Sequence, residues 1–534
     1  MTERSASLLL YSGAIQGRAD CDSIAICGGR ISALGRFEDL RRLAGQETRL
    51  TDLRGAAVAP GFSDCHLHFL EAASASAGLD LSRETSLARI LERLRVHASS
   101  TPPGAWVKAF GCDEAQTVEG RGPSRAELDR VAPNNPLRLR HQTLHASWLN
   151  SSAIETLGLE ACARALPAAA QVLGSADEAL SGLVVGLEKR LSRRIPRMSR
   201  DEFEARARAF SGTLAKAGIT SFTDAGADNG PEEVELFASL VRAGVIRQRV
   251  GLMIGAEHLD RVPSAQQAAD KAAMRLCAVK FMSAAAMQHD GFRSTREREL
   301  SEWVKRVERA LKLGLACAFH ATEVEELETA LSVIERAQGR LKAKGLFPDE
   351  PTAPVRFRIE HGSLIPPNYL ERLAACRAWV VSNPGFLYYR GRKYAGEPGL
   401  FPHLFALRSL IDAGVPVAGG TDAPVTPAKP LTAVYAAVAR RSMGGDELCA
   451  QQALSIGEAL SLFTSRAAQL DGREGGVLAV GRPADLVVLS ANPLDVPPGK
   501  FQDLYVKMTI VGGSIVHEER GQAGPIALEK APLK

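Results

Sequence analysis

Short apolar runs alternate with longer amphipathic stretches through the middle of the chain. Eight of the runs are almost continuously apolar, which is typical of strands covered by helices on one face and by a packed barrel interior on the other. Stretches such as 201–217, 297–313 and 323–343 have helical periodicity. Eight β–α units predict an α/β fold, a (β/α)8 TIM-like barrel. The predicted strands are residues 59–68, 218–226, 247–255, 276–283, 315–322, 356–364, 378–384 and 415–424.

The two ends of the chain have a different pattern, in which short strands are joined by glycine turns. "SLLLYSGAI" and "SIAICGGRISALG" near the start are similar in character to "ADLVVLSANP" and "VKMTIVGGSIVH" near the end, where "GGS" is typical of a tight hairpin. We therefore expect both ends to contribute to one small β-sandwich. Residues 1–58 would form its first half and residues 466–534 its second half.

A long segment separates the first two predicted barrel strands. Residues 70–209 are too many for one barrel helix, so they predict an insertion with its own structure, including a helical stretch around 177–194. An insertion after a barrel strand emerges at the C-terminal face, where such barrels carry out their chemistry. We expect it to act as a lid or to shape the substrate site. The barrel itself would comprise residues 59–69 and 210–465.

Composition excludes several classes of partner. The net charge is only +4 and the basic residues are dispersed, which argues against nucleic acid as a partner. Nine scattered cysteines without a CxxC motif indicate reduced thiols, as in a cytoplasm. No segment approaches about 18 uninterrupted apolar residues, so the sequence predicts no membrane span. We expect a soluble, cytoplasmic protein with a small-molecule substrate.

Six ionisable residues fall at the C-terminal ends of predicted barrel strands. Because these ends converge on one mouth, we expect four imidazoles, one carboxylate and one amine to gather there. Each residue alone has an ordinary alternative as a core histidine, a capping aspartate or a solvated lysine. Together and in this order they indicate a metal site. The six are His66 and His68 on strand 1, which share a face, Lys280 on strand 4, His320 on strand 5, His361 on strand 6 and Asp422 on strand 8.

The residue types explain the chemistry that such a site would perform. Imidazole nitrogens and carboxylate oxygens bind Zn²⁺ and similar ions. A bound ion lowers the pKa of a water molecule to roughly 7, and Asp422 is suited to accept its proton and pass it to a leaving group. A protonated Lys280 beside a dication is costly. A neutral Lys280 can instead react with CO₂ to give a carbamate that bridges two ions.

These motifs resemble the amidohydrolase superfamily and, within it, the YtcJ-like amidohydrolases (the amidohydrolase 3 family), which include N-substituted formamide deformylases. The resemblance extends over nearly the whole chain. It implies the bipartite sandwich and the long insertion as well as the barrel. The similar stretches include "PGFSDCHLH", "WVKAFGCDEAQ", "GITSFTDAG", "RFRIEHGSLI", "GVPVAGGTDAPVTPAKPL" and "GVLAVGRPADLVVL".

The resemblance also implies a role for each candidate residue. His145, in "LHASWLN", matches an insertion histidine that faces the substrate, with packing inside the lid as the alternative. Lys280 matches the lysine that is carboxylated in members with two ions. Similar proteins often have Asp-Gly close behind this lysine, whereas Asp290-Gly291 lie ten residues on, which leaves a single-ion site open. The implied ligands are His66, His68 and Asp422 for the more buried ion, and His320 and His361, with Lys280, for the second.

The sequence therefore predicts a metal-dependent hydrolase that cleaves a C–N bond of an amide, an N-substituted formamide or a cyclic amide. Its catalytic residues would be Asp422 and His145, and its cofactor one or two divalent ions, with Zn²⁺ expected. One alternative is an isomerase or decarboxylase of the same superfamily, because a Lewis acid also stabilises an enolate. Another is a non-catalytic metal-binding protein. The family suggests a homodimer, and the sequence leaves the substrate open.

Overall fold

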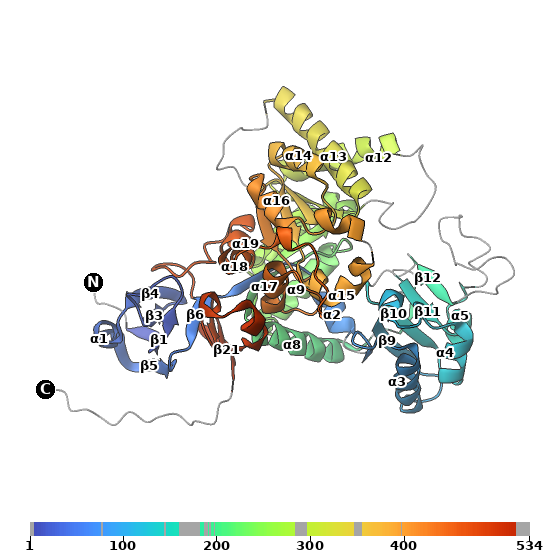
Figure 1. Cartoon of the computed structure of the whole chain (residues 1–534), viewed down its shortest axis with the longest axis horizontal. Helices are drawn as coiled ribbons and strands as arrows, with labels where there is room; N and C mark the ends of the chain where they lie inside the picture. The colour runs from blue at the N-terminus through green and yellow to red at the C-terminus, as the bar shows by residue number, and fades with distance from the viewer. Residues whose placement is uncertain are drawn as a thin grey trace.

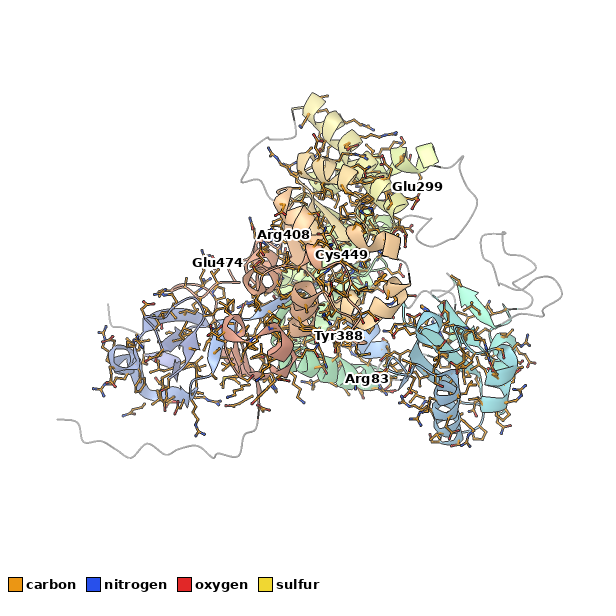
Figure 2. The ribbon with its side chains drawn as sticks, viewed as in Figure 1. Arg83, Glu299, Tyr388, Arg408, Cys449 and Glu474 are labelled. Atoms are coloured by element: carbon orange, nitrogen blue, oxygen red, sulfur yellow. The ribbon has the colours of Figure 1, made fainter. Side chains whose placement is uncertain are left out.

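The computed structural model describes residues 5–519, except 76–77, 144–145, 160–181, 186–190, 192–193, 197, 283–295, 346–354 and 397. Three parts are seen in Figure 1: a β-sandwich at one end, a central barrel, and the insertion at the other end. Side chains fill the space between strands and helices in each part (Figure 2). Among the helices that the structure describes, none is long and apolar enough to cross a membrane.

The centre of the molecule is an eight-stranded parallel sheet whose last strand lies against its first. Asp422 N donates to His66 O and His68 N donates to Ala423 O, both at 2.7 Å, which joins the two ends of the sheet at the mouth. The predicted (β/α)8 barrel is thus confirmed. Its strands, in order, are β7 (Phe62–Leu67), β13 (Ile219–Asp224), β14 (Arg249–Gly255), β15 (Arg275–Phe281), β16 (Ala316–Ala321), β17 (Phe357–His361), β18 (Trp379–Ser382) and β19 (Val417–Gly419).

Helices cover the outside of the barrel and bury the largest apolar core against it. Phe222, Phe281 and Phe319 on the strands and Phe237 on a helix belong to this core. The Ser199 hydroxyl accepts a hydrogen bond from Glu202 N and so caps the first long helix. The helices are α2 (Phe69–Ala75), α8 (Arg200–Lys216), α9 (Pro231–Arg242), α10 (Val262–Lys271), α12 (Arg296–Lys312), α13 (Val324–Ala343), α14 (Leu370–Ala375), α16 (Leu407–Asp412), α17 (Pro430–Ala439), α18 (Ile456–Leu462) and α19 (Ser465–Leu470).

Both chain ends build the sandwich, as expected. One sheet has the order β4-β3-β1-β5 and the other β2-β6-β20-β21-β22, so the second sheet mixes the two ends. Leu10 and Ile24 from the first sheet share a core with Leu486 and Ile510 from the second. The strands are β1 (Ala6–Tyr11), β2 (Ala14–Ile15), β3 (Ser23–Cys27), β4 (Arg30–Gly35), β5 (Ala44–Asp52), β6 (Ala57–Pro60), β20 (Leu486–Leu489), β21 (Val506–Val511) and β22 (Ser514–Glu518).

The insertion has a five-stranded sheet of its own, in the order β12-β11-β10-β9-β8. The predicted helix around 177–194 is wrong at residues 183–185, which form a strand because Leu183 and Val185 pair with Trp148 and Ala146 of the neighbouring strand. The elements are β8 (Leu79–Asp80), α3 (Leu87–Ser99), β9 (Val107–Cys112), α4 (Arg125–Val131), β10 (Leu137–His141), β11 (Ala146–Leu149), α5 (Ser151–Thr156) and β12 (Leu183–Val185).

The insertion is tied to the C-terminal ends of the barrel strands. Arg140 of β10 forms an ion pair of 2.9 Å with Glu71 of α2, the helix that follows the first barrel strand. Gln142 Nε2 donates to Val425 O at 2.5 Å, in the loop after the last barrel strand. Both contacts lie within a few residues of predicted metal ligands, so the insertion is placed beside the mouth.

Candidate metal centre

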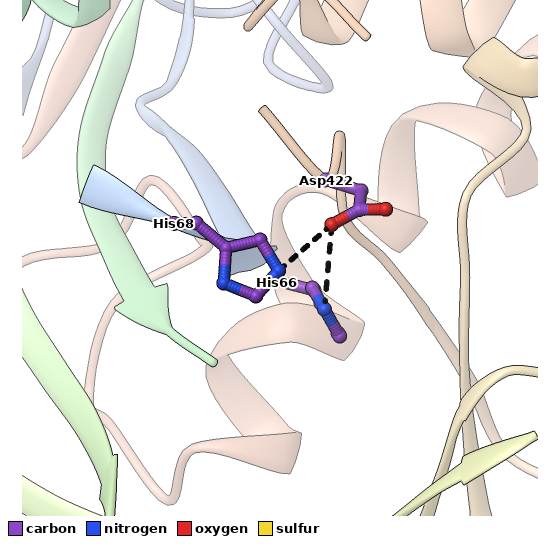
Figure 3. Close-up of side chains that lie close together, drawn as sticks. All are labelled: His66, His68 and Asp422. Carbon is purple, nitrogen blue, oxygen red and sulfur yellow. Dashed lines mark ion pairs between the residues drawn. The ribbon is translucent and has the colours of Figure 1, made fainter. Parts of the chain in front are cut away.

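Three of the predicted ligands lie together where the first and last barrel strands end (Figure 3). His68 Nε2 is 3.1 Å and His66 Nε2 is 3.6 Å from the same oxygen, Asp422 Oδ1. The His66 ring is fully buried, whereas the His68 side chain is 24% exposed. His68 therefore faces the mouth of the barrel, and His66 lies deeper.

The other two imidazoles continue this cluster from β17 and β16. The ring centroids of His66 and His361 are 4.6 Å apart, as are those of His361 and His320. His361 Nδ1 is 2.8 Å from Asn383 Oδ1, so Nδ1 carries the hydrogen and donates it. His361 Nε2 then has a free electron pair and lies 3.1 Å from His320 Nδ1. The structure thus brings all four imidazoles into one continuous row.

Lys280 reaches the same interior from the end of β15. The residue is 2% exposed. Burial lowers the pKa of Lys280 to about 8, against the opposing effect of the Glu360 and Asp422 carboxylates. An amine with such a pKa is neutral in about one molecule in ten at pH 7, far more often than an ordinary lysine, and the neutral amine is the form that reacts with CO₂. Two other predicted features, His145 and the Asp290-Gly291 pair, lie outside the described residues.

The deeper part of the cluster fits a divalent cation. Within the described part of the chain, His66 Nε2 and Asp422 Oδ1 are buried and have no hydrogen-bond partner. Two atoms that bind the same Zn²⁺ at about 2.0–2.1 Å lie roughly 3–3.5 Å apart, close to the separations of 3.1 and 3.6 Å seen here. Imidazole nitrogen and carboxylate oxygen also suit this kind of ion.

Electrostatics favour the metal-binding protonation states of Asp422 and His66. Burial raises the pKa of Asp422, but the adjacent His68 and His66 outweigh it and hold that pKa well below its usual range. Burial, with Lys280 and His361, lowers the pKa of His66 well below 6.5. Burial also lowers the pKa of His68, yet Asp422 outweighs it and the net shift is upward. Asp422 is therefore ionised and His66 neutral.

The backbone at two of these strand ends has an unusual conformation. His361 and Asp422 have φ values of 72° and 60°, in the left-handed region that non-glycine residues rarely adopt. Strain of this kind gathers at functional sites because the surrounding structure must hold it. A Cβ on Gly420 would lie 2.6 Å from His66 Cβ, so only glycine allows the last strand to pass this close.

Two buried aspartates outside the predicted ligand set hold this backbone in place. Asp64 accepts hydrogen bonds from Thr421 N at 2.9 Å and from the Thr421 hydroxyl at 2.5 Å, directly before Asp422. Burial raises the pKa of Asp64 to about 7. Asp224 Oδ2 accepts from Phe69 N at 2.6 Å and so fixes the start of α2 directly after His68. These hydrogen bonds fix the backbone directly after His68 and directly before Asp422.

Sequence reasoning missed Glu360 and Arg358. Glu360 Oε2 is 2.5 Å from His66 Nδ1, and Arg358 Nε is 2.5 Å from Glu360 Oε1. All three residues are buried inside the barrel. The available signal was the alternation in "RFRIEH", where three charged residues, Arg356, Arg358 and Glu360, share one face of the segment.

A second group with metal-binding residue types lies on the insertion. It consists of Asp113, Glu114 and His141, with His141 Nε2 at 3.1 Å from Glu114 Oε2. Arg390 forms a buried ion pair of 2.7 Å with Asp113. Arg390 lies on the helix α15 (Gly385–Ala395), which follows the seventh barrel strand. Packing of Phe386 and Leu387 into an apolar cluster accounts for the helix.

The chain is similar to known proteins over nearly its whole length. Residues 49–517 match the model of the Amidohydrolase family. The chain is 28% identical to an N-substituted formamide deformylase of Arthrobacter pascens, covering 95% of this chain and 97% of that protein. It is 25% identical to the YtcJ protein of Bacillus subtilis (strain 168), covering 93% and 96%. The crystal structure of an uncharacterized metal-dependent hydrolase from Pyrococcus horikoshii OT3 has the same fold, with a TM-score of 0.68 at 21% identity over 92% of this chain and 99% of that one.

Proposed function

This chain belongs to the amidohydrolase family, and on that premise we propose that it is a metal-dependent hydrolase cleaving a C–N bond in an N-substituted formamide, another amide or a cyclic amide. The observation that carries the proposal is the pair of buried atoms without hydrogen-bond partners among the described residues, His66 Nε2 and Asp422 Oδ1. The formamide deformylase of Arthrobacter pascens, similar over nearly its whole length, supports this substrate class.

We assign the ligands to two ions, with Zn²⁺ as the metal. His66, His68 and Asp422 would hold the deeper ion, which their mutual distances support. His320 and His361 would hold the other, with Nδ1 and Nε2 3.1 Å apart. Lys280 would bridge the two as a carbamate, and its burial and its pKa of about 8 support that assignment.

The bound metal supplies Lewis acidity, which lowers the pKa of water and polarises the substrate carbonyl. Asp422 accepts a proton from the attacking water, because its low pKa keeps the carboxylate ionised. The same carboxyl group then delivers that proton to the departing nitrogen. His68, the more exposed of the two strand 1 histidines, lies on the side from which a substrate arrives. We assign His145 on the insertion to contact the substrate.

Metal content tests the site itself. The chain is expressed with added zinc and bicarbonate, and metal per chain is measured by plasma mass spectrometry. We expect near two equivalents. Near one equivalent would remove the carbamate bridge and restrict the centre to His66, His68 and Asp422. A chain that retains essentially none after careful loading would overturn the proposed function and favour a non-metal role.

Labelled water tests the reaction class. We expect turnover of N-substituted formamides or related amides, with one oxygen from H₂¹⁸O appearing in the released acid. Turnover without ¹⁸O in the product would exclude hydrolysis and leave an isomerase or decarboxylase. The Asp422→Asn variant is the control, because it should leave background hydrolysis only.

A further inference from the structure

We propose that Glu360 and Arg358 are positioning residues that fix the His66 ring and thereby raise the affinity of the site for its metal ion. The proposal rests on the proposed function, in which His66 is a ligand. Glu360 is 0% and Arg358 2% exposed, so neither is placed to touch a substrate at the mouth. Both therefore act on the site through neighbouring side chains, and the one in direct contact with Glu360 is His66.

The contact between Glu360 and His66 selects the ring atom that faces the metal. Glu360 Oε2 lies 2.5 Å from His66 Nδ1, and both side chains are fully buried. Because an ionised carboxylate only accepts, Nδ1 carries the hydrogen and donates it. Nε2 then keeps its electron pair, and Nε2 is the atom that lies 3.6 Å from Asp422 Oδ1. A hydrogen bond behind a ligand in this way sets its tautomer and orientation.

Arg358 holds this arrangement at two points. Its guanidinium donates to both oxygens of Glu360, from Nε at 2.5 Å and from a terminal nitrogen at 3.2 Å. The same terminal nitrogen donates to Cys65 O at 3.0 Å, immediately before His66 on β7. One side chain thus fixes the carboxylate behind the ring and the backbone that carries the ring. The guanidinium also provides the partner that a buried carboxylate needs.

The other deep imidazole has a different support. His361 Nδ1 donates to Asn383 Oδ1 at 2.8 Å, and Asn383 Nδ2 donates to Gly420 O at 3.0 Å. A neutral amide therefore stands behind His361, whereas a carboxylate stands behind His66. A carboxylate acceptor makes the imidazole a stronger electron donor to a metal. Removing the charge behind His66 should weaken the ion bound by His66, His68 and Asp422.

The test is the zinc affinity of Glu360→Gln, which keeps the shape and an acceptor oxygen but removes the charge. Apo-protein is titrated with zinc in competition with a chromophoric chelator, so no substrate is needed. We expect the dissociation constant to rise by about 10- to 100-fold. The control is Asp485→Asn, directly before the sandwich strand β20. This variant weakens the two hydrogen bonds of 2.6 and 3.1 Å that Arg249 donates to the Asp485 carboxylate. It should lower the melting temperature and leave zinc affinity unchanged.

A second variant covers the case in which Glu360→Gln does not fold. Arg358→Lys keeps a positive charge but loses the fork, and we expect a rise in dissociation constant of about 3- to 10-fold. A folded Glu360→Gln protein with affinity within about twofold of the parent overturns the inference. So does an equal loss in Asp485→Asn. If the parent chain itself binds no zinc, the proposed function fails. If the parent binds zinc and Glu360→Gln binds it equally well, only the positioning role of Glu360 fails.

Discussion

The proposed metal centre and the insertion cluster contain the same types of side chain, yet their surroundings differ. His66, His68 and Asp422 form one group and Asp113, Glu114 and His141 the other, each with donor atoms within 4.8 Å of one another. In the first group buried acceptor atoms face each other. In the second, the guanidinium of Arg390 already lies 2.7 Å from Asp113. A guanidinium supplies the positive charge that an ion would bring and repels that ion, so residue type and proximity alone do not define a metal site.

The insertion cluster contains an ion pair between two parts of the fold. Asp113 follows β9 of the insertion, and Arg390 lies on α15 of the barrel. Their ion pair, buried at both ends, joins the two parts beside the mouth. His141 is held in turn by Thr143, whose Oγ1 is 2.7 Å from His141 Nδ1. We interpret this cluster as the attachment of the insertion.

The strongest test of this difference is to neutralise one aspartate in each group. Asp422→Asn should lower kcat/KM by about 10²- to 10⁴-fold, because the proton acceptor is lost. Asp113→Asn should keep metal content unchanged and kcat/KM within about tenfold of the parent. Steady-state kinetics and plasma mass spectrometry measure both. An equal loss of metal in the two variants would make the insertion cluster a metal site after all.

The ion pair at the insertion should matter for stability rather than for metal binding. Arg390→Met leaves Asp113 buried without its partner, and we expect the free energy of unfolding to fall by about 3–5 kcal/mol. The double variant Arg390→Met with Asp113→Asn should recover part of that loss, because the buried charge is gone. Urea unfolding followed by circular dichroism measures this. No recovery in the double variant would show that the helix α15, rather than the ion pair, carries the effect.

Replacing Lys280 tests whether the proposed metal centre holds one ion or two. Lys280→Ala should reduce bound zinc from near two equivalents to near one, because the bridging carbamate is lost while His66, His68 and Asp422 remain. Metal analysis with and without bicarbonate during loading measures it. The control is Lys108→Ala on the insertion, which removes a hydrogen bond to Pro196 O and should leave both equivalents in place. Two equivalents in Lys280→Ala would exclude a bridging role.

The smallest expected effect is a dependence of zinc affinity on pH. His68 has a pKa raised above 6.5, and a protonated ring cannot bind metal. Zinc affinity should therefore reach its plateau above that raised pKa and begin to fall, as pH decreases, while the pH is still above 6.5. Chelator competition at a series of pH values measures this. An affinity that stays constant down to pH 6.5 would show that His68 does not compete with protons for the ion.

The fold and the clustering of the predicted strand-end residues were accessible from the sequence because they depend on local pattern and chain order. Apolar runs marked the barrel strands, and the HxH of "DCHLH" with later strand-end residues marked the cluster. Glu360 and Arg358 were not found, since a charged residue inside a strand acquires meaning only from a partner 294 positions away. The helix α15 was missed because glycine and aromatic residues in "GFLYYRGRKYAG" give a weak helical pattern, and packing decides it.

Strand β6 pairs on one side with β2 and on the other with β20, a strand from the far end of the polypeptide. β6 ends at Pro60, and its partner β20 begins only at Leu486. The first barrel strand, β7, follows β6 almost directly. A ribosome adding about 5–20 residues per second would need roughly 20 to 90 seconds to make the 425 residues between them. Throughout that time β6 has one open edge, and such edges invite pairing with other chains. During synthesis, the barrel or a chaperone would have to cover this edge until the last strands emerge.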